Sequence, residues 1–150
     1  MQLRCSFLTT ASPEQVVDAY TDFTERRLEI WRDTLRPQDY ALLDQGSSWA
    51  VVREGSLKMG VTLRYEWSEP YVVRWSILTS SFCDHGAGTL TARAAAGGGA
   101  EVDILIVEQG GKGVRGRVVL ALKGLLGPSV LRRTSKRALD RLARERSDEG

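Results

Sequence analysis

The chain has 150 residues, of which 42% are hydrophobic and 27% charged, and its formal net charge is +2. These values are typical of one soluble globular domain over residues 1–150, and the small net charge argues against a dedicated nucleic-acid-binding protein. No apolar run approaches the roughly 20 residues of a membrane helix, and no signal-peptide pattern opens the chain, so we expect a cytoplasmic protein without membrane insertion.

The N-terminal segment predicts a strand followed by a helix. Residues 3–9 alternate apolar and polar side chains, which is the period of a strand. Ser12 then suits the N-cap of a helix, Pro13 suits its first position, and Gln15 completes a capping box. We therefore expect a helix to begin directly after Ser12.

A second short helix is expected from about Thr24. Its apolar stripe consists of Leu28, Trp31 and Leu35. Pro37 should end this helix, because proline supplies no helical N–H and disfavours helix in the residue before it.

From residue 39 to residue 109 the hydrophobic period changes to two. Short turns separate consecutive segments, which indicates antiparallel pairing. The segments predicted as strands are residues 40–45, 48–54, 59–68, 71–80, 88–95 and 100–109.

The C-terminal segment is helical and basic. Residues 112–150 hold 11 Lys/Arg and 4 Asp/Glu, whereas residues 1–111 hold 10 and 15. Gly124, Gly127 and Pro128 predict a kink or a break, followed by a regular helix of about 15 residues that ends near Arg146. We interpret its charges as a solvated outer face; the alternatives are an RNA or an anionic membrane surface, and no aromatic residues are interleaved with the arginines as in many nucleic-acid platforms.

These elements predict an α+β helix-grip fold. A curved antiparallel seven-stranded sheet would wrap on the long C-terminal helix, with two short helices after strand 1 closing one end. Four features of the chain stand in a characteristic order: the strand-to-helix segment 9–16, Glu69-Pro70 between two strands of which the second carries Trp75, Gly88-Thr89-Leu90-Thr91 and the Leu- and Arg-rich terminal helix. In these features the chain resembles the START-like (SRPBCC) superfamily, in particular its polyketide cyclase/dehydrase and lipid-transport-like branch.

The resemblance implies a cavity between sheet and helix that holds an apolar or aromatic small molecule. Large aromatic residues fall on one face of two predicted strands, where they would either line that cavity or fill the core. The expected ligand-binding residues are Tyr65, Trp67, Trp75, Leu63, Ile77, Tyr20, Leu122 and Leu126.

The candidates for acid–base chemistry are few. His85 is the only histidine and the natural general acid or base, although a solvated loop histidine is the plainer interpretation. Arg64, Glu66 and Asp103 would anchor a ligand if they faced the cavity, and would be exposed ion-pairing residues if they did not.

Metal and cofactor motifs are lacking. Cys5 and Cys83 lie far apart and show no zinc spacing, and no GxGxxG or Walker pattern occurs. We therefore expect no metal and no cofactor, and reduced thiols.

Three hypotheses follow from the sequence. The first is a carrier that sequesters a hydrophobic small molecule, as a monomer or homodimer and without nucleic acid. The second is an aromatase/cyclase or dehydratase that acts on a polyketide-like substrate by holding it in a reactive conformation. The third is an interaction module that uses the basic C-terminal helix.

Overall fold

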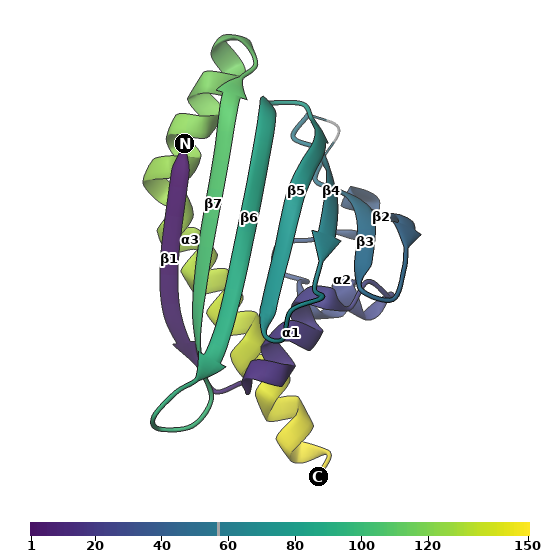
Figure 1. The fold of residues 1–150 in the computed structure, drawn as a ribbon, viewed down its shortest axis with the longest axis vertical. Helices are drawn as coiled ribbons and strands as arrows, with labels where there is room; N and C mark the ends of the chain where they lie inside the picture. Colours follow the sequence, from purple (N-terminus) through teal and green to yellow (C-terminus); the bar gives the residue numbers. More distant parts are fainter. Residues whose placement is uncertain (57) are drawn as a thin grey trace.

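The computed structural model describes residues 1–56 and 58–150, and it confirms the helix-grip architecture (Figure 1). One seven-stranded antiparallel sheet has the order β1-β7-β6-β5-β4-β3-β2, and the helices lie on one of its faces. The elements in chain order are β1 (Gln2–Thr9), α1 (Pro13–Thr21), α2 (Arg26–Ile30), the 3₁₀ turn η1 (Pro37–Asp39), β2 (Tyr40–Gln45), β3 (Trp49–Glu54), β4 (Val61–Glu66), β5 (Val72–Ser80), β6 (Cys83–Ala94), β7 (Ala100–Gly111) and α3 (Gly113–Asp148).

Alternation of side chains gives the sheet an inner face, which the helices cover, and an outer face. Along β1, Leu3, Cys5 and Phe7 are buried while the residues between them are exposed. The central strands β6 and β7 contribute a second row of buried side chains, which includes Leu90 and Ile104. The core therefore lies between the inner face and the three helices, as the period of two predicts.

The capping box predicted for α1 is present. The Ser12 hydroxyl accepts a hydrogen bond from the Gln15 N–H at 3.1 Å, and the Gln15 side chain accepts one from the Ser12 N–H at 2.9 Å. These bonds satisfy main-chain donors that have no partner inside the helix, so α1 begins where its sequence predicts.

A kink or a break was predicted in the C-terminal helix, and the break is wrong, because α3 is continuous over 36 residues with Pro128 inside it. Its glycines serve close packing rather than chain reversal. A Cβ added at Gly116 would overlap the Phe82 carbonyl, and one at Gly127 would overlap the Leu3 side chain. The missing side chains let α3 lie directly on the sheet, which compensates for the low helix propensity of glycine.

The two halves of α3 are buried differently. In the second half, Ser135, Ala138, Leu139, Leu142 and Ala143 are buried against the rest of the molecule. The first half crosses the β1–β7 edge of the sheet (Figure 1), and several of its large apolar side chains face outward. None of the described helices is long and apolar enough to cross a membrane.

Asp140 fastens the second half of α3 to the end of β1. Its Oδ1 accepts hydrogen bonds from the Thr9 hydroxyl at 2.7 Å and the Thr10 N–H at 2.9 Å, and its Oδ2 accepts one from Lys136 at 2.8 Å. Burial alone would raise the pKa of Asp140, but these hydrogen bonds and the Lys136 charge together lower it below its ordinary value.

This lowered pKa predicts an acid-sensitive contribution to stability. A carboxyl group with a lowered pKa in the folded state stabilises the fold above its unfolded pKa of about 3.9, and the effect is lost as the pH falls through the folded value. The free energy of unfolding of the native chain should therefore fall more steeply below about pH 4 than that of Asp140→Asn. Urea denaturation at several pH values measures this, with Asp148→Asn as the exposed control; equal slopes in all three chains would contradict it.

Candidate functional site

Six aromatic residues meet between the inner face of the sheet and the short helices. Tyr65 and Trp67 come from β4 and the residue after it, and Trp75 comes from β5. We call the aromatic cluster the group Tyr20, Phe23, Trp31, Tyr65, Trp67 and Trp75.

The ring contacts within the aromatic cluster form two groups, one of four rings and one of two. Phe23 lies 5.1 Å from Tyr65 and 5.6 Å from Trp67 between ring centroids, and Tyr65 lies 5.8 Å from Trp75. Tyr20 and Trp31 form an edge-to-face pair at 4.7 Å. Such arrangements suit aromatic quadrupoles and add to the burial energy of the rings.

The aromatic cluster and its neighbours are incompletely covered. Leu63 and Tyr65 are buried, but Tyr20, Trp67, Trp75 and Ile77 are only partly buried although they pack against the core. Val61 and Ile106, which also pack against the core, share this partial exposure. Because α3 lies mainly on β1 and β7, apolar surface over β4 and β5 remains accessible.

Glycine on β6 shapes this surface. Gly88 pairs with Trp75 across the two strands, and a Cβ added at Gly88 would overlap the indole. The absent side chain lets the Trp75 ring lie directly over the backbone of β6.

An ion pair between a buried arginine and a half-buried glutamate forms the polar part of the site. Arg27 of α2 is 4% exposed, and it donates from Nε and Nη2 to the Glu54 Oε1 of β3 at 3.1 and 2.9 Å. Its Nη1 donates to the main-chain carbonyls of Tyr20 and Asp22, both at 3.3 Å. The guanidinium lies 4.4 Å from the centroid of the Phe23 ring, so the charge also makes a cation–π contact inside the aromatic cluster.

The shifted pKa values keep Arg27 charged and the phenols of Tyr20 and Tyr65 neutral. Burial opposes the charge on Arg27, but the Glu54 carboxylate raises the pKa of Arg27 above its ordinary value. Burial raises the pKa of Tyr20 to about 12, and it raises the pKa of Tyr65 as well. Both phenols therefore stay protonated at neutral pH, and the Tyr20 hydroxyl donates to the Ser135 Oγ at 3.0 Å.

Sequence reasoning missed Arg27 and Glu54, although a signal was present. Phe23, Arg27 and Ile30 are spaced by four and three residues, so the arginine lies on the same apolar stripe as two buried residues. A charged residue on such a stripe is rarely buried without a partner. The partner itself, at the end of a strand 27 residues away, has no sequence signature.

The four candidates for acid–base chemistry lie outside the site, on the outer face of the sheet, which is the plainer of the two interpretations given for them from sequence. Arg64 and Glu66 form an ion pair of 2.9 Å on the outer face of β4. Asp103 accepts a hydrogen bond from the exposed Ser6 and lies 3.5 Å from the exposed Arg93. His85 is exposed on β6. The physical reason is strand alternation, because each of these residues is next in sequence to an inward-facing one.

Two other expected ligand-binding residues are also placed wrongly. Leu122 and Leu126 of α3 are 51% and 61% exposed and point away from the sheet. The opposite side of the helix packs onto the sheet through Gly116, Leu120, Gly124 and Gly127. Leu122 and Leu126 are therefore turned outward.

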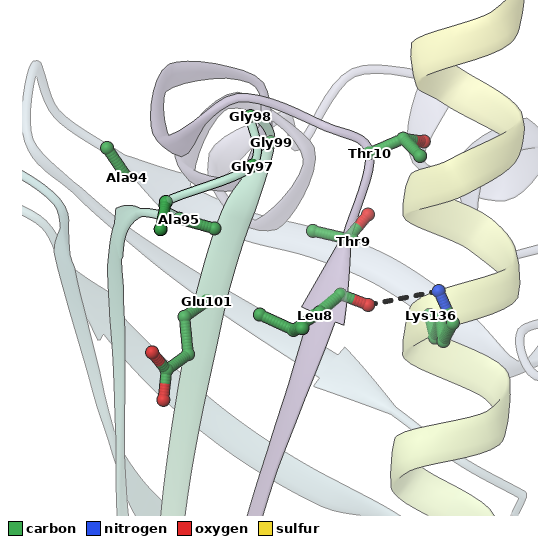
Figure 2. Close-up of a pocket in the computed structure, with 11 residues that line it drawn as sticks. Leu8, Thr9, Thr10, Ala94, Ala95, Gly97, Gly98, Gly99, Glu101 and Lys136 are labelled. Carbon is green, nitrogen blue, oxygen red and sulfur yellow. Dashed lines mark hydrogen bonds between the residues drawn. The ribbon is translucent and has the colours of Figure 1, made fainter.

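Open hollows lie at the C-terminal end of β1. One has a volume of about 760 Å³ and is bordered by the β6–β7 turn and Lys136, as Figure 2 shows. Lys136 reaches from α3 to the Leu8 carbonyl at 3.0 Å and closes one side of the hollow. A smaller hollow of about 270 Å³ is lined by Thr10 and the end of α3. Neither hollow is lined by the aromatic cluster.

Metal ligands do not gather in the described part of the chain, where no three His, Cys, Asp or Glu side chains are placed to hold an ion. Cys5 and Cys83 are both buried and free of disulfide bonds. The chemistry that the site offers is therefore that of apolar rings, one guanidinium–carboxylate pair and protonated phenols.

Comparison with solved structures identifies the fold. A protein of Thermus thermophilus superposes with a TM-score of 0.74 at 16% identity and covers 98% of this chain and 99% of its own. The Zhui aromatase/cyclase of a Streptomyces species superposes with a TM-score of 0.74 at 16% identity, and the match covers 98% of this chain and 95% of the cyclase. A START superfamily protein of Mycobacterium smegmatis superposes with a TM-score of 0.71 at 12% identity, and the match covers 96% of this chain and 97% of that protein. No protein-family model matches the chain, and no curated protein matches it in sequence.

Proposed function

We propose that this chain, which has the helix-grip fold of the START-like proteins, binds a hydrophobic small molecule that carries a flat ring. The molecule would lie on the inner face of β4 and β5, with its ring against Trp75 and its apolar part along Ile77 and Val61. The observation that carries the proposal is the partial exposure of apolar side chains that point inward. We expect the side chains of a close-packed core to be covered more completely than these.

The Arg27–Glu54 pair gives the proposed ligand its orientation. A buried ion pair contributes little net stability relative to well-packed apolar residues, so its presence calls for another reason. A ligand with one polar oxygen on an apolar body would match a guanidinium that is in contact with aromatic rings. We therefore expect ligands such as aromatic or alicyclic molecules with a carbonyl or carboxylate group.

The test is a change of side-chain volume on one strand. Ile77 and Leu78 are neighbours on β5 that face opposite sides of the sheet, because Ile77 packs on the core and Leu78 is 51% exposed. Ile77→Trp should fill the proposed site and weaken binding of the neutral fluorescent probe N-phenyl-1-naphthylamine at least tenfold, whereas Leu78→Trp should leave it unchanged. Titration of probe fluorescence measures both, and circular dichroism checks the fold. Equal affinity in the two variants, or no probe binding by the native chain, would contradict the proposal.

A cyclase or dehydratase acting on a polyketide-like substrate is the second candidate. The observation that favours it is the position of the Tyr65 phenol, which stays protonated beside the Arg27 guanidinium and can donate a hydrogen bond to a developing oxyanion. Tyr65→Phe would then abolish turnover of a poly-β-ketone substrate while probe affinity remained the same. Lack of turnover by the native chain would contradict the enzyme hypothesis, and ligand binding would remain as the only proposed function.

A further inference from the structure

The first half of α3 carries a continuous apolar surface that faces away from the sheet. Six large side chains spaced by four, four, three, one and four residues are each at least half exposed. We call them the outer stripe: Val114, Val118, Leu122, Leu125, Leu126 and Val130. Scattered apolar residues on a surface need no explanation, but a contiguous row on one helix marks an interaction site.

The charged residues along the part of the chain that carries the outer stripe are all cationic, and one of them, Lys123, is paired with Glu108 of β7. Between Glu108 and Asp140 the chain has eight Lys or Arg residues and no acidic residue. Arg115 and Arg117 lie at the N-terminal end of the outer stripe, while Arg133 and Arg137 continue along the helix beyond Val130. No carboxylate among the described residues forms an ion pair with any of these four arginines.

The adjacent loop extends this cationic and apolar surface. Arg115 donates a hydrogen bond to the Lys58 carbonyl at 3.3 Å, which brings Lys58 beside the start of α3. Lys58 and the next residue, Met59, are both exposed. The surface is therefore not restricted to one helix.

We propose that the outer stripe and its arginines dock on the surface of a bilayer that contains anionic lipid. A helix with an apolar row and basic residues at its margins lies in the membrane interface, where the apolar side chains enter the acyl boundary and the cations meet the headgroups. The charge of this surface is complementary to anionic lipid. The 31 consecutive residues 109–139 contain no acidic residue that would repel the headgroups.

A second copy of the chain fits this surface poorly. In a two-fold pairing of α3 with itself, an antiparallel arrangement centred on Leu122 would bring Arg115 close to Arg132 and Arg133 of the second copy. A parallel arrangement would bring each arginine close to its own equivalent. Like charges that meet in this way oppose association, so the bilayer is the better occupant.

The inference goes beyond the proposed ligand site and is tested separately from it. Co-sedimentation with vesicles of phosphatidylcholine containing 30 mol% phosphatidylglycerol should retain the native chain, and pure phosphatidylcholine vesicles should retain much less. Leu122→Glu should reduce binding to the anionic vesicles at least tenfold, while Leu78→Glu should not, and both leucines are 51% exposed in the native fold. Binding of N-phenyl-1-naphthylamine in the absence of vesicles should be equal in both variants.

A second pair of changes tests the charge. Arg133→Gln with Arg137→Gln should weaken binding about fivefold for each charge removed, and raising the salt concentration should weaken native binding in the same direction. Failure of the native chain to bind anionic vesicles would overturn the proposal, as would equal losses in Leu122→Glu and Leu78→Glu. Analytical ultracentrifugation that revealed a dimer sensitive to Leu122→Glu would assign the outer stripe to a second copy instead.

Discussion

Replacing Arg27 by methionine should lower the free energy of unfolding by up to about 3–5 kcal/mol, the range for removing one partner of a buried ion pair, because Arg27 is buried although the Glu54 side chain is 21% exposed. The guanidinium is 4% exposed and makes four hydrogen bonds, two of them to Glu54. Methionine fills much of the same volume, so the loss comes mainly from the Glu54 carboxylate and the carbonyls of Tyr20 and Asp22, which are left without a donor.

A double substitution separates this effect from packing. In Arg27→Met with Glu54→Met, no buried charge remains, and the loss should shrink to within about 1.5 kcal/mol of the native chain. Urea denaturation followed by tryptophan fluorescence measures the four chains of the cycle. Arg74→Met is the matched control, because Arg74 pairs with Glu69 at an exposed site and its loss should change stability little. An Arg27→Met variant as stable as the control would contradict the importance of the pair.

Leu139→Ala should cost about 2–5 kcal/mol, the range for deleting a buried leucine side chain. Leu139 is 0% exposed and belongs to the core cluster between α3 and the sheet. Neighbouring side chains can close only part of the space that the substitution opens, so the cost includes both lost burial and a cavity.

The same substitution on the outer stripe is the control. Leu125 lies on the same helix and is 78% exposed, so Leu125→Ala should change the free energy of unfolding by less than about 0.5 kcal/mol. Thermal and urea unfolding of the two variants can be compared directly, because helix propensity changes equally in both. A large loss in Leu125→Ala would show that the outer stripe is covered by another part of the protein in solution.

The strands could be predicted from sequence because their physical cause is local. Residues 40–45 were predicted as a strand and form β2 with the same bounds, and the other strands begin or end within a few residues of their predictions. The largest difference is β6, which begins at Cys83 rather than at residue 88. Gly86 and Gly88 weaken the strand pattern there, and pairing with β7 decides the outcome.

The faces of α3 could not be predicted in the same way. Its sequence has apolar residues on both sides of the first half, and ordinary amphipathic reasoning assigns the larger ones to the core. Here glycines take the inward positions, because close approach to Leu3 and Phe82 leaves no room for a side chain. Leu122 was therefore predicted inward and lies outward.

The aromatic residues of the site were predicted from alternation, whereas its polar residues were not. Tyr65 and Trp75 share the inner face with Leu63 and Val73, as the period of two requires. The pairing of Arg27 with Glu54 depends on how α2 folds back over β3, which is a tertiary property.

The pairing of β1 with β7 has a consequence for synthesis on the ribosome. Gln2 pairs with Val107 and Thr9 with Ala100, so β1 has no neighbouring strand until residues about 90 to 105 positions later have been made. At about 5–20 residues per second this interval lasts about 5–20 s. During that interval the nascent chain presents Leu3, Cys5 and Phe7 without their cover. These residues therefore form the segment of the emerging polypeptide where a chaperone that recognises extended apolar sequence would bind first.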